Sequence, residues 1–201
     1  MVRRISSGEA PSWVRGRLAG PTGTIPPRTC WIGIDGLGAS GKSTLAARVA
    51  AGLAGAVVVP VDDFAHPDVP TWQRDRFVAE VLAPLLAGWP GRYRPADLLT
   101  GALGEPVEVP TSVPVVVEGV SATDVRLGVP WDLTLWLEVP EAERRRRIAE
   151  RDRAELLARW HTDWWPQEEA YVAAQRPAAR VSAVVLPDLS DRQRAMNPPR
   201  V

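Results

Sequence analysis

The sequence lacks several features that would place it in a specialised class of proteins. Its single cysteine, Cys30, excludes a disulfide framework within the chain. No run of about 18 apolar residues is present, so no membrane span is expected, and the N-terminus lacks the apolar core of a signal peptide. The 24 basic and 24 acidic residues cancel, which argues against a nucleic-acid-binding domain. These absences favour a cytoplasmic protein without membrane or nucleic-acid partners.

The composition that remains is typical of one globular domain. Hydrophobic residues make up 45% of the 201 residues and charged residues 24%. Residues 1–28 are rich in Arg, Ser, Gly and Pro and show no sustained period, so we expect a loosely ordered segment there. The alternative is a segment bound across the surface of the domain through Trp13 and Leu18. We place the folded domain at residues 29–190 and a tail at 191–201.

Apolar strand patterns alternate with helical patterns along the domain. We expect strands at residues 30–35, 56–61, 113–117, 132–139 and 181–186, and helices at 43–53, 74–86, 141–160 and 167–174. Strands so uniformly apolar are covered on both faces, as in a parallel sheet. The alternation therefore predicts an α/β, doubly wound fold with a five-stranded parallel sheet flanked by helices. The Pro- and Gly-rich residues 88–112 are expected to form a loop region on the substrate side.

A phosphate-binding loop is the strongest motif in the chain. Residues 36–43, GLGASGKS, match G-x-x-x-x-G-K-[ST] in full, between a strand ending at Asp35 and a helix beginning near Lys42. Backbone N–H groups of such a loop and the helix N-terminus bind phosphates. The alternative is a Gly-rich turn that only starts a helix. The predicted nucleotide-binding residues are Gly36, Gly38, Ala39, Ser40, Gly41, Lys42, Ser43 and Thr44.

Two carboxylates follow strands and are predicted to face the same crevice. Asp62 comes after the second strand, where a carboxylate could accept the proton of an attacking hydroxyl group. Glu118 ends the third strand and is suited to hold Mg²⁺ beside Ser43. The predicted metal ligands are therefore Ser43, Glu118 and Asp62. Alternatively, Asp62 and Asp63 form only a turn or a helix cap, and Glu118 is a solvated strand end.

An arginine-rich stretch follows the fourth strand. Arg147 and Arg151 are four residues apart, so they share a helical face. An arginine that reaches the transferring phosphoryl group can accelerate transfer by about 10³-fold or more. We predict that Lys42, Asp62, Arg147 and Arg151 are catalytic, with the arginines on a helical lid. In the alternative interpretation the run is a solvated helix whose arginines pair with neighbouring glutamates.

The sequence resembles the uridine kinase-like branch of the P-loop kinases, particularly its short actinobacterial members, over residues 30 to 188. The similar stretches are GASGKST (38–44), VDDF (61–64), HP (66–67), WQR (72–74), EVLAPL (80–85), RYR (92–94), VVVEGV (115–120), DLTLWLEVP (132–140), RIAERD (147–152), residues 164–171 and RP (176–177). The resemblance implies a P-loop NTPase fold with a lid, an NTP–Mg²⁺ donor and a nucleoside-like acceptor. It also implies that Asp62 is the base and Glu118 a magnesium-side carboxylate.

The acceptor-binding part departs from this family while the phosphate-binding part is complete. The segment before the HP pair is nearly absent, Thr71 stands where the family has an acid for the ribose hydroxyls, and Ala96-Asp97 replaces a Tyr-Asp pair. This pattern fits a changed acceptor. Polar loop residues and aromatic faces are the candidates for binding it, with turn or packing roles as the alternatives. They are Asp63, His66, Tyr93, Arg94, Asp97, Trp164 and Arg176.

The function predicted from the sequence is ATP-dependent phosphorylation of a small hydroxylated molecule. The donor is ATP or another NTP with Mg²⁺, the acceptor is a nucleoside or another metabolite, and the protein is a monomer or a homodimer. A nucleoside monophosphate kinase is one alternative, with Arg92, Arg94 and Arg176 as candidate ligands of the acceptor phosphate. A regulatory NTP-binding switch is the other, although the N-K-x-D motif of GTPases is missing.

Overall fold

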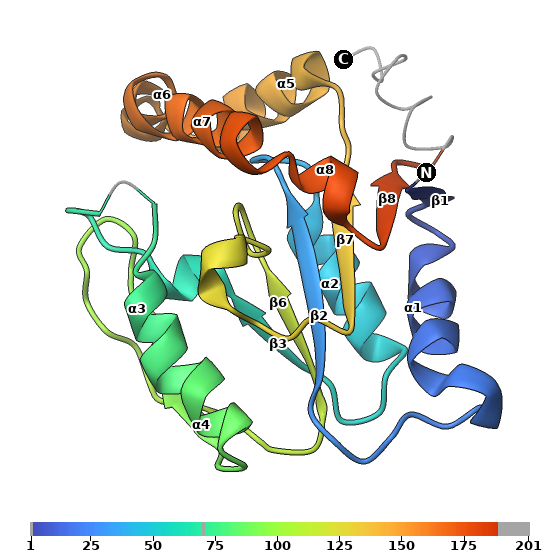
Figure 1. Cartoon of the computed structure of the whole chain (residues 1–201). Coiled ribbons are helices and arrows are strands. Elements are labelled where there is room, and N and C mark those ends of the chain that lie inside the picture. The colour runs from blue at the N-terminus through green and yellow to red at the C-terminus, as the bar shows by residue number, and fades with distance from the viewer. Residues whose placement is uncertain (1, 70, 189–201) are drawn as a thin grey trace.

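The computed structural model describes residues 2–69 and 71–188, and its centre is a parallel β-sheet (Figure 1). The sheet has six strands in the order β1-β8-β7-β2-β6-β3. They are β1 (Arg3–Ser6), β2 (Cys30–Gly36), β3 (Val57–Pro60), β6 (Pro114–Glu118), β7 (Leu133–Leu137) and β8 (Ala183–Leu186). The doubly wound α/β class is as predicted, but the expected number of five strands was wrong by one.

The additional strand comes from the N-terminal segment. β1 pairs in parallel with β8, with Ile5 opposite Val185, and α1 (Ala10–Ala19) buries Ala10 and Val14 completely. Residues 3–19 are thus ordered, and the expectation of a loosely ordered segment 1–28 was wrong for them. A four-residue edge strand is too short to show a period, which explains the error. Trp13 and Leu18 pack beside the same core, as the alternative expected. The predicted tail, residues 191–201, lies outside the described residues.

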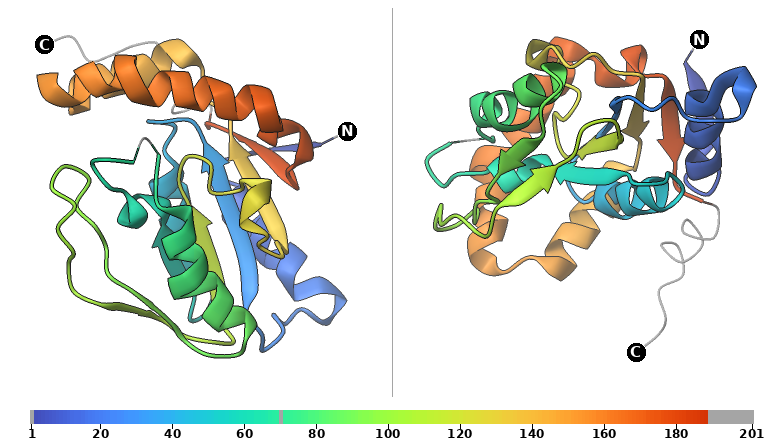
Figure 2. Two further views of the ribbon diagram at one scale, coloured as in Figure 1. Left: turned by 60° about the vertical axis from the view of Figure 1, so that its left-hand side comes forward. Right: turned by 90° about the horizontal axis from the view of Figure 1, so that it is seen from below.

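Helices cover both faces of the sheet (Figure 2). One face packs on α1 and α2 (Lys42–Ala51), where Ile32 and Ile34 meet Leu45 and Val49. The other face carries Val115 and Val117 against a helix formed by α3 (Arg74–Phe77), the π-helical η3 (Val78–Leu82) and α4 (Ala83–Leu86). Burial on both faces explains why the strands are apolar at nearly every position.

The C-terminal helices lie across the carboxyl ends of the strands (Figure 1). They are α5 (Glu141–Arg151), α6 (Ala154–Arg159), the π-helical η5 (Trp160–Trp164), α7 (Trp165–Gln175) and α8 (Pro177–Arg180). The helix expected at 141–160 is divided at Asp152, whose backbone is extended (φ −95°, ψ 143°). Its carboxylate accepts hydrogen bonds from Arg151 and from the indole N–H of Trp160, which fixes the bend.

The remaining elements are short. β4 (Gly91–Tyr93) and β5 (Val107–Val109) form a two-stranded antiparallel sheet inside the region expected to be a loop. The 3₁₀ turns are η1 (Gly20–Thr22), η2 (Val61–Phe64) and η4 (Val125–Leu127). Among the helices of the described residues, none has the length and apolarity needed to cross a membrane.

Candidate active site

A large cleft opens between the carboxyl ends of the strands and the C-terminal helices. Its volume is about 1300 Å³. Pockets for one small ligand usually measure roughly 300–1,000 Å³, so this cleft has room for two. The residues that follow β2, β3 and β6 line it, and so do parts of α5, η5 and α7. Ligand sites in open α/β sheets lie at this edge, because the loops after parallel strands meet there.

The phosphate-loop motif forms the turn between β2 and α2. Gly36 has a φ of 151°, and a Cβ there would lie 2.8 Å from the carbonyl oxygen of Leu137, so only glycine fits. No side chain caps α2, and its first N–H groups have no acceptor within the helix. The Ser40 hydroxyl is buried and has no hydrogen-bond partner among the described residues. These unsatisfied donors fit an anionic group such as a phosphate.

Lys42, Ser43 and Glu118 lie together where β2 and β6 end. Lys42 Nζ donates to the carbonyl oxygen of Leu37 at 3.0 Å. Burial raises the pKa of Glu118, although Ser43 and Lys42 act in the opposite direction. All three residues line the cleft, as do Gly38, Ala39, Gly41 and Thr44 of the predicted loop, whereas Gly36 and Ser40 lie behind its surface.

The two aspartates of η2 point to different surroundings. Asp62 is exposed and lines the cleft, as its predicted role requires. Asp63 does not line the cleft, and its carboxylate accepts a 2.8 Å hydrogen bond from the hydroxyl group of Tyr93. Burial raises the pKa of Asp63 and also that of Tyr93. The structure thus brings two predicted substrate residues together, but outside the cleft.

Most of the other predicted substrate residues also lie outside the cleft. His66 accepts a backbone N–H within its own turn at 3.2 Å, and Arg94 donates to the carbonyl oxygen of Gly104 at 2.7 Å. Asp97 accepts the backbone N–H groups of its own turn, and Arg176 is exposed at the end of α7 with a φ of 43°. Only Trp164 of this set lines the cleft.

The arginine run divides into cleft residues and surface residues. Arg147 and Arg151 both line the cleft. Arg147 forms an ion pair with Glu143 of its own helix at 2.7 Å and also donates to the carbonyl oxygen of Ala39 at 3.3 Å. Arg151 forms an ion pair with Asp152. Arg145 and Arg146 pair with glutamates of the same helix, as the alternative interpretation expected.

A buried ion pair on the phosphate loop was not predicted from the sequence. Glu168 of α7 accepts the backbone N–H of Gly38 at 2.5 Å, and Arg144 of α5 lies 3.3 Å from both Glu168 and the Gly38 carbonyl oxygen. Burial raises the pKa of Glu168, against the influence of Gly38, Arg144 and Lys42. The ring of Trp160 covers Gly38 so closely that a Cβ there would lie 2.1 Å from it. In the sequence, both charged residues look like ordinary members of charged helices.

Asp35 anchors the elements around the cleft. Its side chain is fully buried at the end of β2 and accepts hydrogen bonds from the backbone N–H groups of Gly36, Ser121 and Thr123. It also accepts the hydroxyl groups of Thr123 at 2.7 Å and of Tyr171 at 2.6 Å. One carboxylate therefore fixes α7 and the loop after β6 to the strand that carries the phosphate loop.

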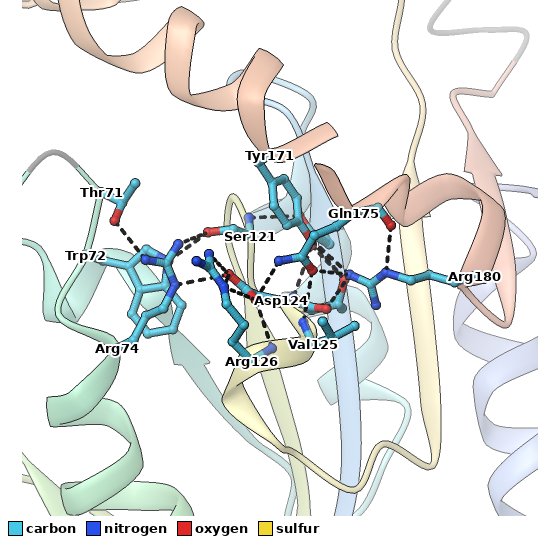
Figure 3. A network of polar contacts seen from close by, with 12 residues as sticks. Thr71, Trp72, Arg74, Ser121, Asp124, Val125, Arg126, Tyr171, Gln175 and Arg180 are labelled. Atoms are coloured by element: carbon cyan, nitrogen blue, oxygen red, sulfur yellow. Dashed lines mark hydrogen bonds and ion pairs between the residues drawn. The ribbon is translucent and has the colours of Figure 1, made fainter. Parts of the chain in front are cut away.

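A second fully buried carboxylate, Asp124, contacts two arginines that line the cleft (Figure 3). Its oxygens lie 3.3 Å from Arg74 Nε and accept hydrogen bonds from Arg126 and Gln175. Burial alone would raise the pKa of Asp124, but these hydrogen bonds outweigh it and lower the pKa to about 2. Arg74 and Arg126 line the cleft, and neither was predicted as a site residue.

No preformed cluster for a metal ion exists in the part of the chain that the structure describes. There, no three His, Cys, Asp or Glu side chains are grouped so that they could hold one. The predicted ligands Ser43, Glu118 and Asp62 all line the cleft. Oxygen donors of this kind suit Mg²⁺, which usually takes only one or two ligands from a protein and the others from phosphates and water.

Comparisons with known proteins identify the fold. No protein-family model matches the sequence, and no curated protein matches it. Among solved structures, a candidate uridine kinase from Bacillus stearothermophilus superposes with a TM-score of 0.64 and 17% identity, over 89% of this chain and 96% of that one. A candidate fructose transport system kinase from Silicibacter sp. TM1040 gives 0.66 and 22%, over 90% and 98%. The chain shares the α/β fold of these two proteins, and this is the fold class that its sequence resemblance implied.

Proposed function

We propose that the protein is a phosphotransferase that moves the γ-phosphoryl group of an NTP, in the first place ATP, onto a hydroxyl group of a small acceptor. The observation that carries the proposal is the joint position of Asp62 and the phosphate loop. Asp62, Lys42, Ser43 and Glu118 come from three neighbouring strands and line one cleft that has room for two ligands. A loop that bound a nucleotide only for regulation would need no exposed carboxylate beside a second ligand space.

The residues support an in-line transfer with Asp62 as the base. The Asp62 carboxylate takes the proton of the acceptor hydroxyl group as its oxygen bonds to the γ-phosphorus atom. The bond between the γ-phosphorus and the β–γ bridging oxygen breaks, and the nucleoside diphosphate leaves. Lys42 and Arg147 are placed to balance the charge that develops on the phosphoryl oxygens. We also propose that α5, α6 and α7 act as the lid that excludes water.

The donor set fits a nucleotide and Mg²⁺. The uncapped N-terminus of α2 and the unpartnered Ser40 hydroxyl would hold the phosphates, with Lys42 between the β- and γ-phosphates. Ser43 and Glu118 would hold the metal ion, whose chemical contribution is to neutralise the phosphate oxygens.

A nucleoside monophosphate kinase remains the second candidate. The arginines proposed for it from the sequence, Arg92, Arg94 and Arg176, do not line the cleft. Arg74 and Arg126 do line it, and because guanidinium groups bind phosphate, this observation supports a phosphate-bearing acceptor.

The proposal is tested by measuring ADP release from Mg²⁺-ATP with a panel of nucleosides, nucleotides and sugars. We expect release that depends on one class of acceptor and yields a phosphorylated alcohol in ³¹P NMR. Slow release that no acceptor stimulates would favour a regulatory switch. Conversion of a nucleoside monophosphate acceptor into its own nucleoside diphosphate, in addition to the ADP released, would favour the second candidate. Absence of any Mg²⁺-nucleotide affinity in calorimetry would refute both enzymatic readings.

A further inference from the structure

We propose that the acceptor carries a negatively charged group, a carboxylate or a phosphate, that Arg74 and Arg126 bind where they line the cleft. This inference rests on the proposed function and adds the substrate class. It assigns the charged group a binding role, distinct from the hydroxyl group that attacks the γ-phosphorus.

The charged residues that line the cleft divide by chain segment. Where residues 71–74, 120–126 and 170–175 line the cleft, they contribute two arginines and no carboxylate. The acids that line the cleft come from other segments and are Asp62, Glu118, Glu150, Asp152 and Glu168. Asp75, the neighbour of Arg74, is exposed and does not line it. Two cleft-lining arginines without a carboxylate in their own segments favour an anion over a neutral or cationic group.

Both guanidinium groups keep donors available for a ligand. Asp124 uses Nε and Nη2 of Arg126, and within residues 2–69 and 71–188 no group accepts a hydrogen bond from its Nη1. The Arg126 side chain is 66% exposed. Among the described residues, the two Nη atoms of Arg74 donate only to the hydroxyl groups of Thr71 and Ser121, at 3.2 and 3.4 Å. Guanidinium donors in this state bind a carboxylate or a phosphate with charge-assisted hydrogen bonds.

The pair is held in place before a ligand arrives. Both arginines contact Asp124 Oδ2, so their guanidinium groups lie next to one another (Figure 3). The Arg74 guanidinium also lies over the ring of Trp72 at 5.3 Å, and Trp72 Nε1 donates to Ser121 Oγ at 3.0 Å. Asp124 supplies one negative charge to two positive ones. A second anion would relieve the remaining repulsion between the arginines, and little side-chain entropy would be lost on binding.

The position of the pair connects it with the acceptor. Arg74 opens α3 directly after Gln73, whose backbone N–H donates to the carbonyl oxygen of Phe64 at 2.8 Å. Phe64 is the last residue of η2, the turn that carries the proposed base. The arginines that contact the phosphate loop are different ones, namely Arg144 and Arg147. An anion at Arg74 and Arg126 is therefore assigned to the acceptor and not to the triphosphate.

Matched pairs of acceptors test this inference. The probes are uridine with uridine monophosphate, fructose with fructose 6-phosphate, and glucose with gluconate, each assayed for ADP release with Mg²⁺-ATP. In at least one pair we expect kcat/KM to be about tenfold or more higher for the charged member. Arg126→Gln should remove most of that preference through the KM of the charged member. Arg92→Gln, at an exposed arginine outside the cleft, is the matched control and should keep it.

The outcomes separate this inference from the proposed function. A preference for the charged member in only the two phosphate pairs identifies the anion as a phosphate, and a preference in only the gluconate pair identifies it as a carboxylate. Equal use of neutral and charged members overturns the inference and leaves the kinase function standing. So does an Arg126→Gln variant whose KM rises for Mg²⁺-ATP instead. If no probe stimulates ADP release, the probes are titrated calorimetrically into the protein with a non-hydrolysable ATP analogue and Mg²⁺. Binding of a charged probe that Arg126→Gln weakens supports the anion site, and absence of such binding overturns it.

Discussion

Oε1 of Glu168 accepts a hydrogen bond from the backbone N–H of Gly38 in the phosphate loop at 2.5 Å. The same carboxylate pairs with Arg144, and only 6% of the residue is exposed. A helix far along the chain thus places a negative charge on the loop that is proposed to bind a triphosphate. In this arrangement Glu168 opposes the incoming phosphates, and its protonation state should influence nucleotide affinity.

Removal of this charge should strengthen nucleotide binding. Glu168→Gln keeps the acceptor oxygen for Gly38 but abolishes the repulsion, so we expect the Kd for Mg²⁺-ATP to fall on the order of tenfold. Calorimetry at pH 7.5 measures it. Glu169→Gln, at the exposed neighbour in α7, is the matched control and should leave the Kd unchanged. Equal values of Kd for both variants would show that Glu168 does not oppose the phosphates.

The effect of Glu168 should also depend on pH. Burial raises the pKa of this carboxyl group, so it takes up a proton at higher pH than an ordinary glutamate. The protonated group is neutral and no longer repels phosphate, so the wild-type Kd should approach that of Glu168→Gln as the pH falls. The ratio of the two Kd values, measured from pH 8 down to the lowest pH at which both proteins remain folded, cancels the titration of ATP itself. A ratio that stays constant over this range would contradict the prediction.

The two neighbouring aspartates of η2 should differ in their importance for transfer. Asp62→Asn removes the proposed base, and we expect kcat to fall by about 10²- to 10⁴-fold with an unchanged Kd for Mg²⁺-ATP. Asp63→Asn changes a carboxylate that pairs with Tyr93 outside the cleft, so its kcat should stay within a few-fold of wild type. Acceptor-dependent ADP release measures both variants. Similar losses for the two would mean that neither aspartate has been assigned correctly.

The sequence predicts which residues form the turn between β2 and α2, for a local reason. Residues 36–43 form one continuous turn between a strand and a helix, so their spacing alone reveals their joint position. Asp62 and Glu118 could be added because the ends of parallel strands share one edge of a sheet. The same reasoning failed for Asp63, since adjacent residues in a 3₁₀ turn point in different directions and only one of them lines the cleft.

The proposed acceptor site depends on contacts that a single sequence does not reveal. Arg74 and Arg126 meet at Asp124, which lies 50 positions after the first arginine and 2 before the second. None of the three stands in a recognisable spacing. His66, Arg94 and Asp97 were suggested as site residues because they are polar and lie in loops. In the structure all three form hydrogen bonds within their own loops, so their polarity stabilises the loops. The edge strand β1 was not predicted because four residues are too few to show an alternation of apolar and polar side chains.

The Asp124 cluster should make the stability of the protein depend on pH in acid. The pKa of Asp124 is lowered to about 2 in the folded protein from an ordinary value of 3.8. The unfolded state therefore binds a proton first as the pH falls, and the stability that ionised Asp124 contributes is lost from about pH 5 downwards. About 1 kcal/mol should be lost by pH 3. Urea unfolding of wild type and Asp124→Asn measures this loss as a difference in unfolding free energy that shrinks between pH 6 and pH 3. A constant difference would contradict it.

The contact between Gly38 and Trp160 should be detectable as a coupling between the phosphate loop and η5. In Gly38→Ala the new methyl group would lie 2.1 Å from Trp160 Cη2, so the ring has to move, and we expect a loss of about 1 to 3 kcal/mol in unfolding free energy. Trp160→Phe shortens the ring and should absorb part of that strain. The double variant should therefore be more stable than the sum of the single changes predicts, by about 0.5 kcal/mol or more.

Gly16→Ala is the matched control for this cycle, because a Cβ at that position of α1 meets nothing within 4 Å. It should leave stability unchanged or raise it slightly, since alanine favours helix over glycine. Urea unfolding of all variants supplies the free energies. Additive effects of Gly38→Ala and Trp160→Phe would mean that the loop and the tryptophan are independent in solution, and that η5 does not rest on the phosphate loop in the absence of nucleotide.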